Sequence, residues 1–206
     1  EDLGDEIFTT ELWHETNDVK KGIIKIHEHF PKNIGTCIYS SPHIANATPI
    51  NKTTRRKYTS NGSYDNVDLL TMEADYIQRC LFEPTEIDLY ENAIPVCPWG
   101  IKYNNTYKLV TRKMLNLTQE RTMIATIIPE GATHTFSLFG VAFKNMEELL
   151  LFSGVCVSIV GDFLIKVMGK SNTTMDNLGK LPIIKNLEFK SPIIHRVLLL
   201  MCITVN

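Results

Sequence analysis

Apolar positions in the middle of the chain predict a group of neighbouring strands. From Tyr107 onward the pattern is that of strands, and residues 123–128 are apolar except for Thr126. A short run with apolar residues at successive positions is typical of a strand that is buried on both faces. Residues 133–139 alternate between polar and apolar, which predicts a strand that is exposed on one face. This part of the chain therefore predicts the core of a sheet.

Helical patterns lie on both sides of these strands. Asn145, with a glutamate three residues later, is typical of a helix N-cap, and the apolar run that follows continues towards Val167. Glycines and charged residues interrupt the run, so we expect one buried core helix or two in tandem rather than a membrane span. A short helix is predicted at 173–178, and apolar residues at helical spacing predict another at 68–80.

The first third of the chain has weaker patterns. Residues 1–21 predict a helix or a loose lead-in, residues 22–27 a short strand, and residues 35–66 a long irregular segment. We predict an α+β fold with a mixed sheet flanked by the 145–168 helix. Residues 1–34 form its lead-in and residues 35–206 its main domain. Neither end resembles a natural terminus, so we expect a piece of a longer protein.

Composition adds little to this picture. Of the 206 residues, 44% are hydrophobic and 21% charged, and the formal net charge is −2. This is ordinary for a soluble protein and gives no overall attraction to nucleic acid, so a nucleic-acid surface requires local clusters of Lys and Arg. The five cysteines show neither a CxxC pair nor metal-ligand spacing, which favours a reducing, cytoplasmic compartment.

The strongest basic cluster lies at residues 52–58. It contains Lys52, Arg55, Arg56 and Lys57, and Tyr58 follows directly. Such a group can neutralise several phosphates, while the tyrosine ring can stack on a base or contact a sugar. The alternative interpretation is a solvated charged loop.

A second basic population surrounds the predicted strands. Its members include Lys108, Arg112 and Arg121. Arg121 can contact a guanine edge or a phosphate, or it can pair with a carboxylate such as Glu120. His134 lies between two threonines, a setting more typical of a surface strand residue than of a ligand.

Sequence motifs for catalysis are mostly missing. The chain contains no GxGxxG, P-loop, HExxH or GxSxG pattern. Glu188 and Lys190, with Asp176 upstream, have the ExK outline of a strand in a metal-dependent nuclease, where carboxylates hold a divalent ion. A nuclease fragment is therefore one alternative function.

A second alternative is an extracellular interaction module. Sequons of the form Asn-x-Ser/Thr are more frequent than composition alone would give, and they predict N-glycosylation in a secreted protein. They begin at Asn46, Asn51, Asn61, Asn104, Asn116 and Asn172.

Several segments together resemble one known family. The sequences at 112–129, 149–163 and 181–183 are similar, in order and spacing, to the target-recognition region of adenine-N6 DNA methyltransferases. The likeness is to the fused type IIG restriction-modification enzymes with a TaqI-like C-terminal specificity domain. Upstream, residues 41–43, 51–53 and 64–69 also resemble such enzymes. The resemblance covers roughly residues 35–200.

The resemblance implies a domain that docks on duplex DNA and reads a short sequence. The family's catalytic Asn-Pro-Pro-Tyr and its glycine-rich S-adenosylmethionine loop are absent here, and Val157 stands where the family has an asparagine. We therefore expect no cofactor in this chain and S-adenosylmethionine in an N-terminal methyltransferase domain of the same bacterial-type protein. The cluster at 52–58 would grip phosphates. Loops near Arg112, Arg121, Thr133 and His134 would approach base edges, and Lys108 is a further expected DNA-binding residue.

Overall fold

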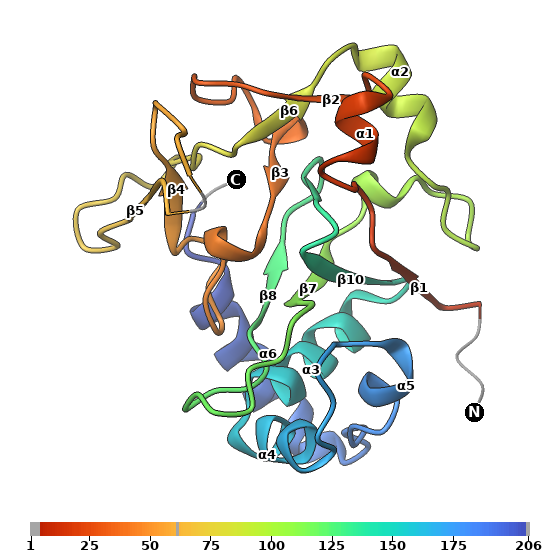
Figure 1. Cartoon of the computed structure of the whole chain (residues 1–206). Coiled ribbons are helices and arrows are strands. Elements are labelled where there is room, and N and C mark those ends of the chain that lie inside the picture. The colour runs from red at the N-terminus through yellow and green to blue at the C-terminus, as the bar shows by residue number, and fades with distance from the viewer. Residues whose placement is uncertain (1–4, 61, 205–206) are drawn as a thin grey trace.

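Two four-stranded sheets form the centre of the fold in the computed structural model, which describes residues 5–60 and 62–204 (Figure 1). The first sheet is antiparallel throughout, with the strand order β1-β10-β7-β8. Its strands are β1 (Ile7–Thr10), β10 (Leu138–Phe143), β7 (Lys108–Arg112) and β8 (Ala125–Ile128). β7 and β8 confirm the two strands predicted from the apolar runs.

The second sheet has the order β2-β6-β3-β9 and is mixed, because β3 and β9 run parallel while the other pairs are antiparallel. Its strands are β2 (Ile24–Ile26), β6 (Phe82–Pro84), β3 (Ile38–Tyr39) and β9 (Thr133–His134). Only residues 135–137 separate β9 from β10, so the chain passes directly from one sheet to the other. The predicted lead-in supplies an edge strand to each sheet, since β1 and β2 both come from it.

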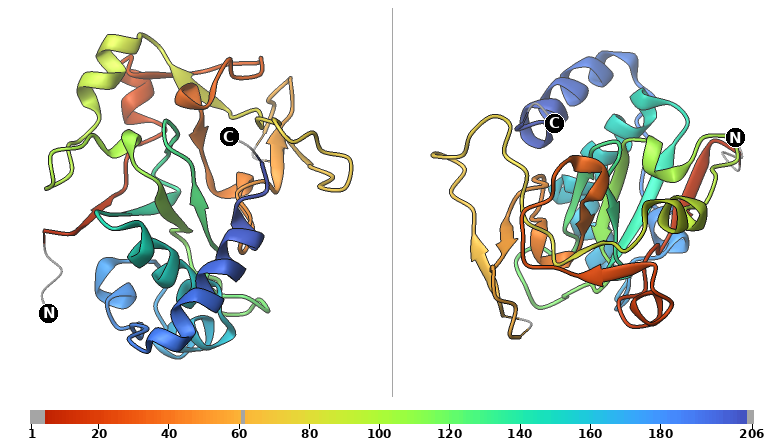
Figure 2. Two further views of the ribbon diagram at one scale, coloured as in Figure 1. Left: turned by 180° about the vertical axis from the view of Figure 1, so that it is seen from behind. Right: turned by 90° about the horizontal axis from the view of Figure 1, so that it is seen from above.

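A separate two-stranded sheet projects at one side of the molecule (Figures 1 and 2). It pairs β4 (Lys52–Thr54) with β5 (Tyr64–Asn66) in antiparallel register. Both strands lie within the segment that was predicted to be irregular. We call β4, β5 and the loop between them the basic hairpin.

Helices follow the strands in the last third of the chain. Asn145 caps the first of them as predicted, because its side chain accepts a hydrogen bond from the Glu147 backbone N–H. The predicted tandem arrangement is also confirmed: the chain bends by 67° between α3 and α4, and Ser158 caps the second helix. The helices are α1 (Asn17–Lys20), α2 (Ile87–Ala93), α3 (Met146–Val157), α4 (Ile159–Val167), α5 (Met175–Leu178) and α6 (Leu187–Met201), with 3₁₀ turns at Ile34–Thr36, Ser41–His43 and Tyr103–Asn105.

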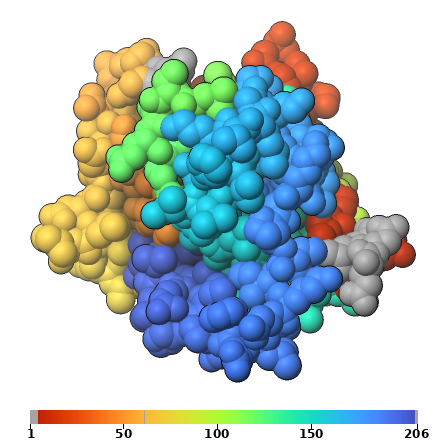
Figure 3. All heavy atoms as spheres, turned by 90° about the horizontal axis from the view of Figure 1, so that it is seen from below, coloured from red at the N-terminus to blue at the C-terminus, as the bar shows by residue number. Residues whose placement is uncertain are grey.

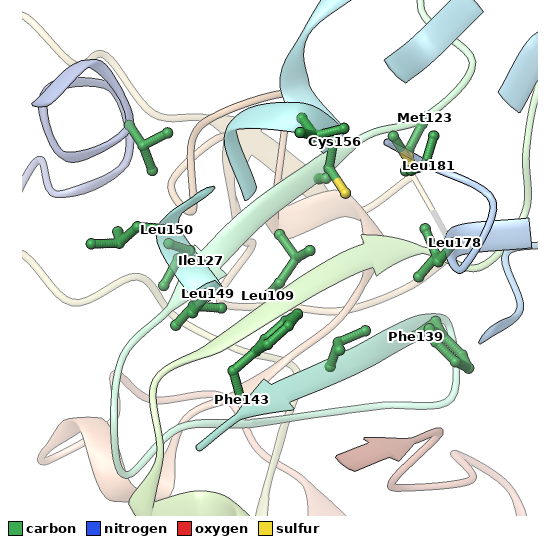
Figure 4. Close-up of a cluster of buried hydrophobic side chains, with 14 of the residues drawn as sticks. Leu109, Met123, Ile127, Phe139, Phe143, Leu149, Leu150, Cys156, Leu178 and Leu181 are labelled. Carbon is green, nitrogen blue, oxygen red and sulfur yellow. The ribbon is translucent and has the colours of Figure 1, made fainter. Parts of the chain in front are cut away.

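The main hydrophobic core lies between the first sheet and the helices (Figure 4). Leu109 of β7 and Ile127 of β8 face Leu149 and Cys156 of α3, and all four are buried. Burying a leucine side chain contributes about 1.5–3 kcal/mol, so this contact fixes α3 on the sheet. Seen from below, α4, α5 and α6 cover most of that end of the molecule, and the basic hairpin lies at its side (Figure 3).

Two further sequence predictions about secondary structure are wrong. Residues 68–80 form turns instead of a helix. The Asp68 side chain accepts a hydrogen bond from the Leu70 N–H, and the Arg79 carbonyl accepts one from the Thr54 N–H. Residues 133–139 do not form one half-exposed strand: Thr133 and His134 of β9 are both fully buried, and residues 135–137 form a turn before β10. In both places, contacts with distant parts of the chain override the local pattern.

The described part of the chain has no single helix that is long and apolar enough to cross a membrane. α3 and α4 reach that length and composition only as a pair, with the 67° bend between them.

Candidate nucleic-acid interface

The basic hairpin presents three exposed cations at the start of its loop. Arg55, Arg56 and Lys57 directly follow β4 and all are exposed, whereas Thr54 is fully buried. Thr54 anchors the hairpin because its N–H donates to the Arg79 carbonyl at 3.0 Å and its own carbonyl accepts from Arg79 Nε at 2.6 Å. The structure therefore holds the base of the loop and leaves its cationic tip in solvent.

Acidic side chains neutralise only part of this charge. Arg55 Nε lies 2.8 Å from an Asp65 carboxylate oxygen across the hairpin, and both side chains are more than half exposed. Such a surface pair contributes little to stability and can be exchanged for a phosphate. Among the described residues, Arg56 and Lys57 have no ion-pair partner, and Lys52 is half-buried on β4.

A small cavity of about 210 Å³ lies at the base of the same hairpin. Tyr58 and Tyr64 contribute aromatic rings to its wall, and Ser41 and Ser137 contribute hydroxyl groups held by mutual hydrogen bonds of 2.6 and 3.0 Å. Pockets that enclose drug-sized ligands measure roughly 300–1,000 Å³, so this one is small for a nucleotide cofactor. Burial raises the pKa of the Tyr64 hydroxyl, which keeps it neutral and able to donate. The remaining lining residues are Glu15, Ser40, Pro42, Leu81 and Phe82.

Lys108 does not reach this surface, and its predicted role at the DNA is corrected by its burial. Its ammonium group is enclosed and donates to the backbone carbonyls of Ala132 at 2.7 Å, Asn104 at 3.3 Å and Pro129 at 3.4 Å. Burial lowers the pKa of Lys108 to about 7, far below its ordinary value of 10.5. Lys108 therefore ties β7 to the turn that precedes β9.

This burial predicts a pH dependence of stability. Between the folded-state pKa of about 7 and the ordinary value of 10.5, the unfolded chain binds more protons than the folded one. The free energy of unfolding should therefore rise from pH 7 to pH 10, by roughly 3–4 kcal/mol from this group. Urea denaturation across that range checks this, with Lys108→Met as the comparison. If the variant keeps the full slope, Lys108 is not its source.

Thr133 and His134 are likewise fully buried, so the prediction that they approach base edges is wrong. Thr133 Oγ1 accepts a hydrogen bond from Trp13 Nε1 at 3.0 Å and lies 2.6 Å from the Tyr90 hydroxyl. His134 Nε2 lies 2.8 Å from the Tyr103 hydroxyl, and burial lowers the pKa of His134 to about 4. Both side chains stabilise the junction of the two sheets.

Arg112 and Arg121 hold loops through backbone carbonyls instead of facing a base. Arg112 donates to the carbonyls of Ser41 at 3.1 Å and Ile44 at 2.7 Å, and burial lowers its pKa. Arg121 donates to the carbonyl of Val157 at the end of α3. A structural role for Arg121 was one of the two predicted alternatives, with Glu120 as the expected partner. The partner is instead a helix C-terminus, where a cation is favoured.

Asp162 is a buried residue that the sequence analysis did not single out. It lies in α4, and its Oδ1 accepts hydrogen bonds from the N–H groups of Thr122 at 2.9 Å and Met123 at 2.7 Å. Together with the Arg121 contact, it joins the segment before β8 to the α3–α4 bend. The sequence feature that could have indicated this contact is the resemblance to the family, because the family-like segments at 112–129 and 149–163 contain both partners.

Comparison with models of known protein families gives no match, and no curated protein matches the chain.

The residues behind the nuclease alternative lie in a different setting from the predicted one. Glu188 and Lys190 are in the first turn of α6, so the expected strand is absent at this position. Lys190 forms an ion pair with Glu147 at 2.6 Å, and Asp176 of α5 pairs with Lys180 just after that helix. Lys190 and Asp176 thus have local partners, and the Glu188 carboxylate lies on a different helix from Asp176.

The predicted N-glycosylation sites differ in their exposure to solvent. Asn104 is buried and its side-chain amide donates to Glu91 at 2.9 Å, so a glycan has no room there. Asn116 and Asn172 are exposed, and Asn61 lies outside the described residues.

Proposed function

We propose that this chain is a DNA sequence-recognition domain of an adenine-specific restriction-modification methyltransferase. It docks on duplex DNA and positions a separate catalytic domain that uses S-adenosylmethionine. The observation that carries this proposal is the basic hairpin, whose exposed cations lie beside a small cavity with aromatic and hydroxyl walls. The family resemblance supplies the enzyme class.

Electrostatics favour the hairpin as the contact to the phosphate backbone. The chain as a whole is slightly acidic, so binding to a polyanion depends on local positive charge. Arg55, Arg56 and Lys57 supply that charge from consecutive positions on an anchored loop. Contacts of this kind fix the orientation of a protein on DNA without reading its sequence.

The cavity offers the chemistry needed to read a base. The hydroxyl oxygens of Ser41 and Ser137 can accept hydrogen bonds, the carboxylate of Glu15 accepts from exocyclic amino groups, and the ring of Tyr58 offers an apolar face. We therefore assign base reading to residues 41, 58, 64 and 137 in place of the buried Thr133 and His134. Flipping and methylating the adenine is left to the catalytic domain.

The arrangement of the family-like segments also supports the proposal. Arg112 contacts the 41–44 turn, and the 121–123 segment contacts the α3–α4 bend, so segments that are distant in the sequence meet in pairs. The segments that resemble the family therefore contact one another within one folded unit.

Replacing both Arg56 and Lys57 by Ala should weaken binding to every duplex sequence. Removing two phosphate contacts is expected to lower the slope of log K against log salt concentration by about 2. Fluorescence anisotropy with a labelled duplex at 50–200 mM salt measures this slope. Because both side chains are exposed, the fold should be unchanged.

Lys170 and Lys185 provide the matched control, since they are exposed cations on the loops around α5. Their double replacement by Ala alters the net charge equally and should leave the salt slope unchanged. If the two double variants lower the salt slope equally, the basic hairpin is not the contact to the phosphate backbone. Absence of salt-dependent binding in the unmodified chain would contradict the proposed function as a whole.

A further inference from the structure

Two histidines and a glutamate converge at the edge of the second sheet, away from the basic hairpin's cavity. β2 and β6 pair with Lys25 opposite Glu83, and the His27 N–H continues the ladder by donating to the Leu81 carbonyl at 3.1 Å. Side chains two residues apart on a strand lie on the same face. The pairing therefore brings Lys25, His27 and Glu83 to one face, and His29 follows at the next same-face position.

The distances between the three groups fit a single ion. His29 Nε2 lies 2.9 Å and His27 Nδ1 lies 4.0 Å from the same carboxylate oxygen of Glu83. One ligand atom from each residue falls within 4.8 Å of the other two. A tetrahedral zinc ion with bonds of about 2.0–2.2 Å holds its ligand atoms roughly 3.4 Å apart. Small side-chain rotations are enough to reach that geometry.

His27 is the residue whose surroundings require an explanation. The residue is only 7% exposed, and neither ring nitrogen has a hydrogen-bond partner among the described residues. Leaving a buried polar group without a partner costs about 1–3 kcal/mol. His29, by contrast, is exposed and paired with Glu83. A bound ion would give one of the two His27 ring nitrogens a partner and keep the carboxylate neutralised.

We propose that His27, His29 and Glu83 bind a divalent metal ion of the zinc class, with water completing the coordination. Two imidazoles and one carboxylate are a common ligand set for zinc. The ion links the segment after β2 to the middle of β6, so its binding stabilises this edge of the second sheet. Binding requires no participation of the basic hairpin, and it stands independently of the proposed DNA contact.

Nearby cations set an upper limit on the affinity. Lys25 Nζ lies 3.4 Å from the other oxygen of Glu83, and Arg79 is close enough to His27 to disfavour positive charge there. Lys25→Gln removes one competitor for the carboxylate while leaving the three ligands in place. This variant is therefore expected to bind the ion more tightly than the unmodified chain.

Titration of the chain with zinc chloride tests the proposal. Every protein in the series carries Cys202→Ser, because the exposed Cys202 thiol is another possible zinc ligand. Isothermal titration calorimetry should give one ion per chain, and the melting temperature should rise with zinc. Cobalt should give the visible absorption of a tetrahedral nitrogen and oxygen site.

His29→Ala and Glu83→Gln are the informative variants, since each removes a ligand without opening a cavity in the core. Each is expected to weaken zinc binding by about tenfold or more. His195→Ala, an exposed histidine on α6, is the matched control and should bind as the parent does. The proposal is overturned if zinc does not bind, or if His29→Ala and Glu83→Gln bind it as well as His195→Ala.

Discussion

Asp162→Ala is expected to lower the free energy of unfolding by about 3–6 kcal/mol. The buried carboxylate accepts hydrogen bonds from two backbone N–H groups, those of Thr122 and Met123. Hydrogen bonds to a charged group contribute about 1.5–3 kcal/mol each, and alanine leaves both donors buried without a partner. Such a loss is a large part of the stability of an ordinary domain. Urea denaturation followed by circular dichroism measures it.

Asp162→Asn is the matched control because it retains a side-chain oxygen at nearly the same position. It should lose clearly less stability than the alanine variant, since both N–H groups keep an acceptor. Equal losses in the two variants would show that charge, not the acceptor geometry, dominates at this position. A loss below about 1 kcal/mol in Asp162→Ala would contradict the anchoring role.

Gly140→Ala is expected to destabilise the fold by about 3 kcal/mol. Gly140 lies in the middle of β10, where an added Cβ would stand 2.0 Å from the Tyr103 hydroxyl and 2.3 Å from His134 Nε2. Both residues are fully buried, and the two atoms are hydrogen-bonded to each other. Neither can therefore move without disturbing the sheet junction. Forcing an extra carbon into a packed core typically costs about 1–3 kcal/mol, and the lost hydrogen bond adds to this.

A double-mutant cycle with Tyr103→Phe shows whether the clash is the cause. Removing the hydroxyl relieves the shorter of the two contacts, so Gly140→Ala should cost less in the Tyr103→Phe background than in the unmodified chain. Thermal denaturation of the four proteins gives the coupling energy. Strict additivity would mean that the cost comes from elsewhere in β10.

The elements predicted correctly are those whose pattern is local. The apolar run that forms β8 and the Asn145 cap of α3 are each decided by a few neighbouring residues. The burial of Thr133 and His134 depends instead on parallel pairing with β3, which lies far away in the sequence. Because alternation alone cannot reveal a partner strand, the pattern predicted a half-exposed strand where the structure has a buried one.

α6 was missed for a related reason. Pro192 lies inside it, and a proline normally argues against the interior of a helix. Here the apolar side of the helix packs against α3, where Gly154 allows Ile193 to approach closely. Tertiary packing thus maintains a helix that propensity alone would not predict.

The same difference between local patterns and distant contacts applies to the residues predicted for the candidate site. The cationic loop at 55–57 is evident from charge alone, and the structure leaves it exposed. Arg112 and Arg121, within the family-like motif, instead donate hydrogen bonds to carbonyl groups of the backbone. Whether an arginine or lysine faces solvent or a buried carbonyl depends on the loop that folds over it, and a single sequence does not contain that information.

The attachment of the basic hairpin has a final consequence for how much sequence variation the molecule tolerates. In the described part of the chain its strands pair only with each other, and its attachment depends on the buried base around Thr54 and Arg79 and on the packing of Tyr58 against a hydrophobic cluster, while Arg55, Arg56 and Lys57 at the tip are exposed. Substitutions at the tip should therefore cost little stability. Directed evolution can vary such a loop extensively, and the scaffold tolerates the resulting library without being redesigned.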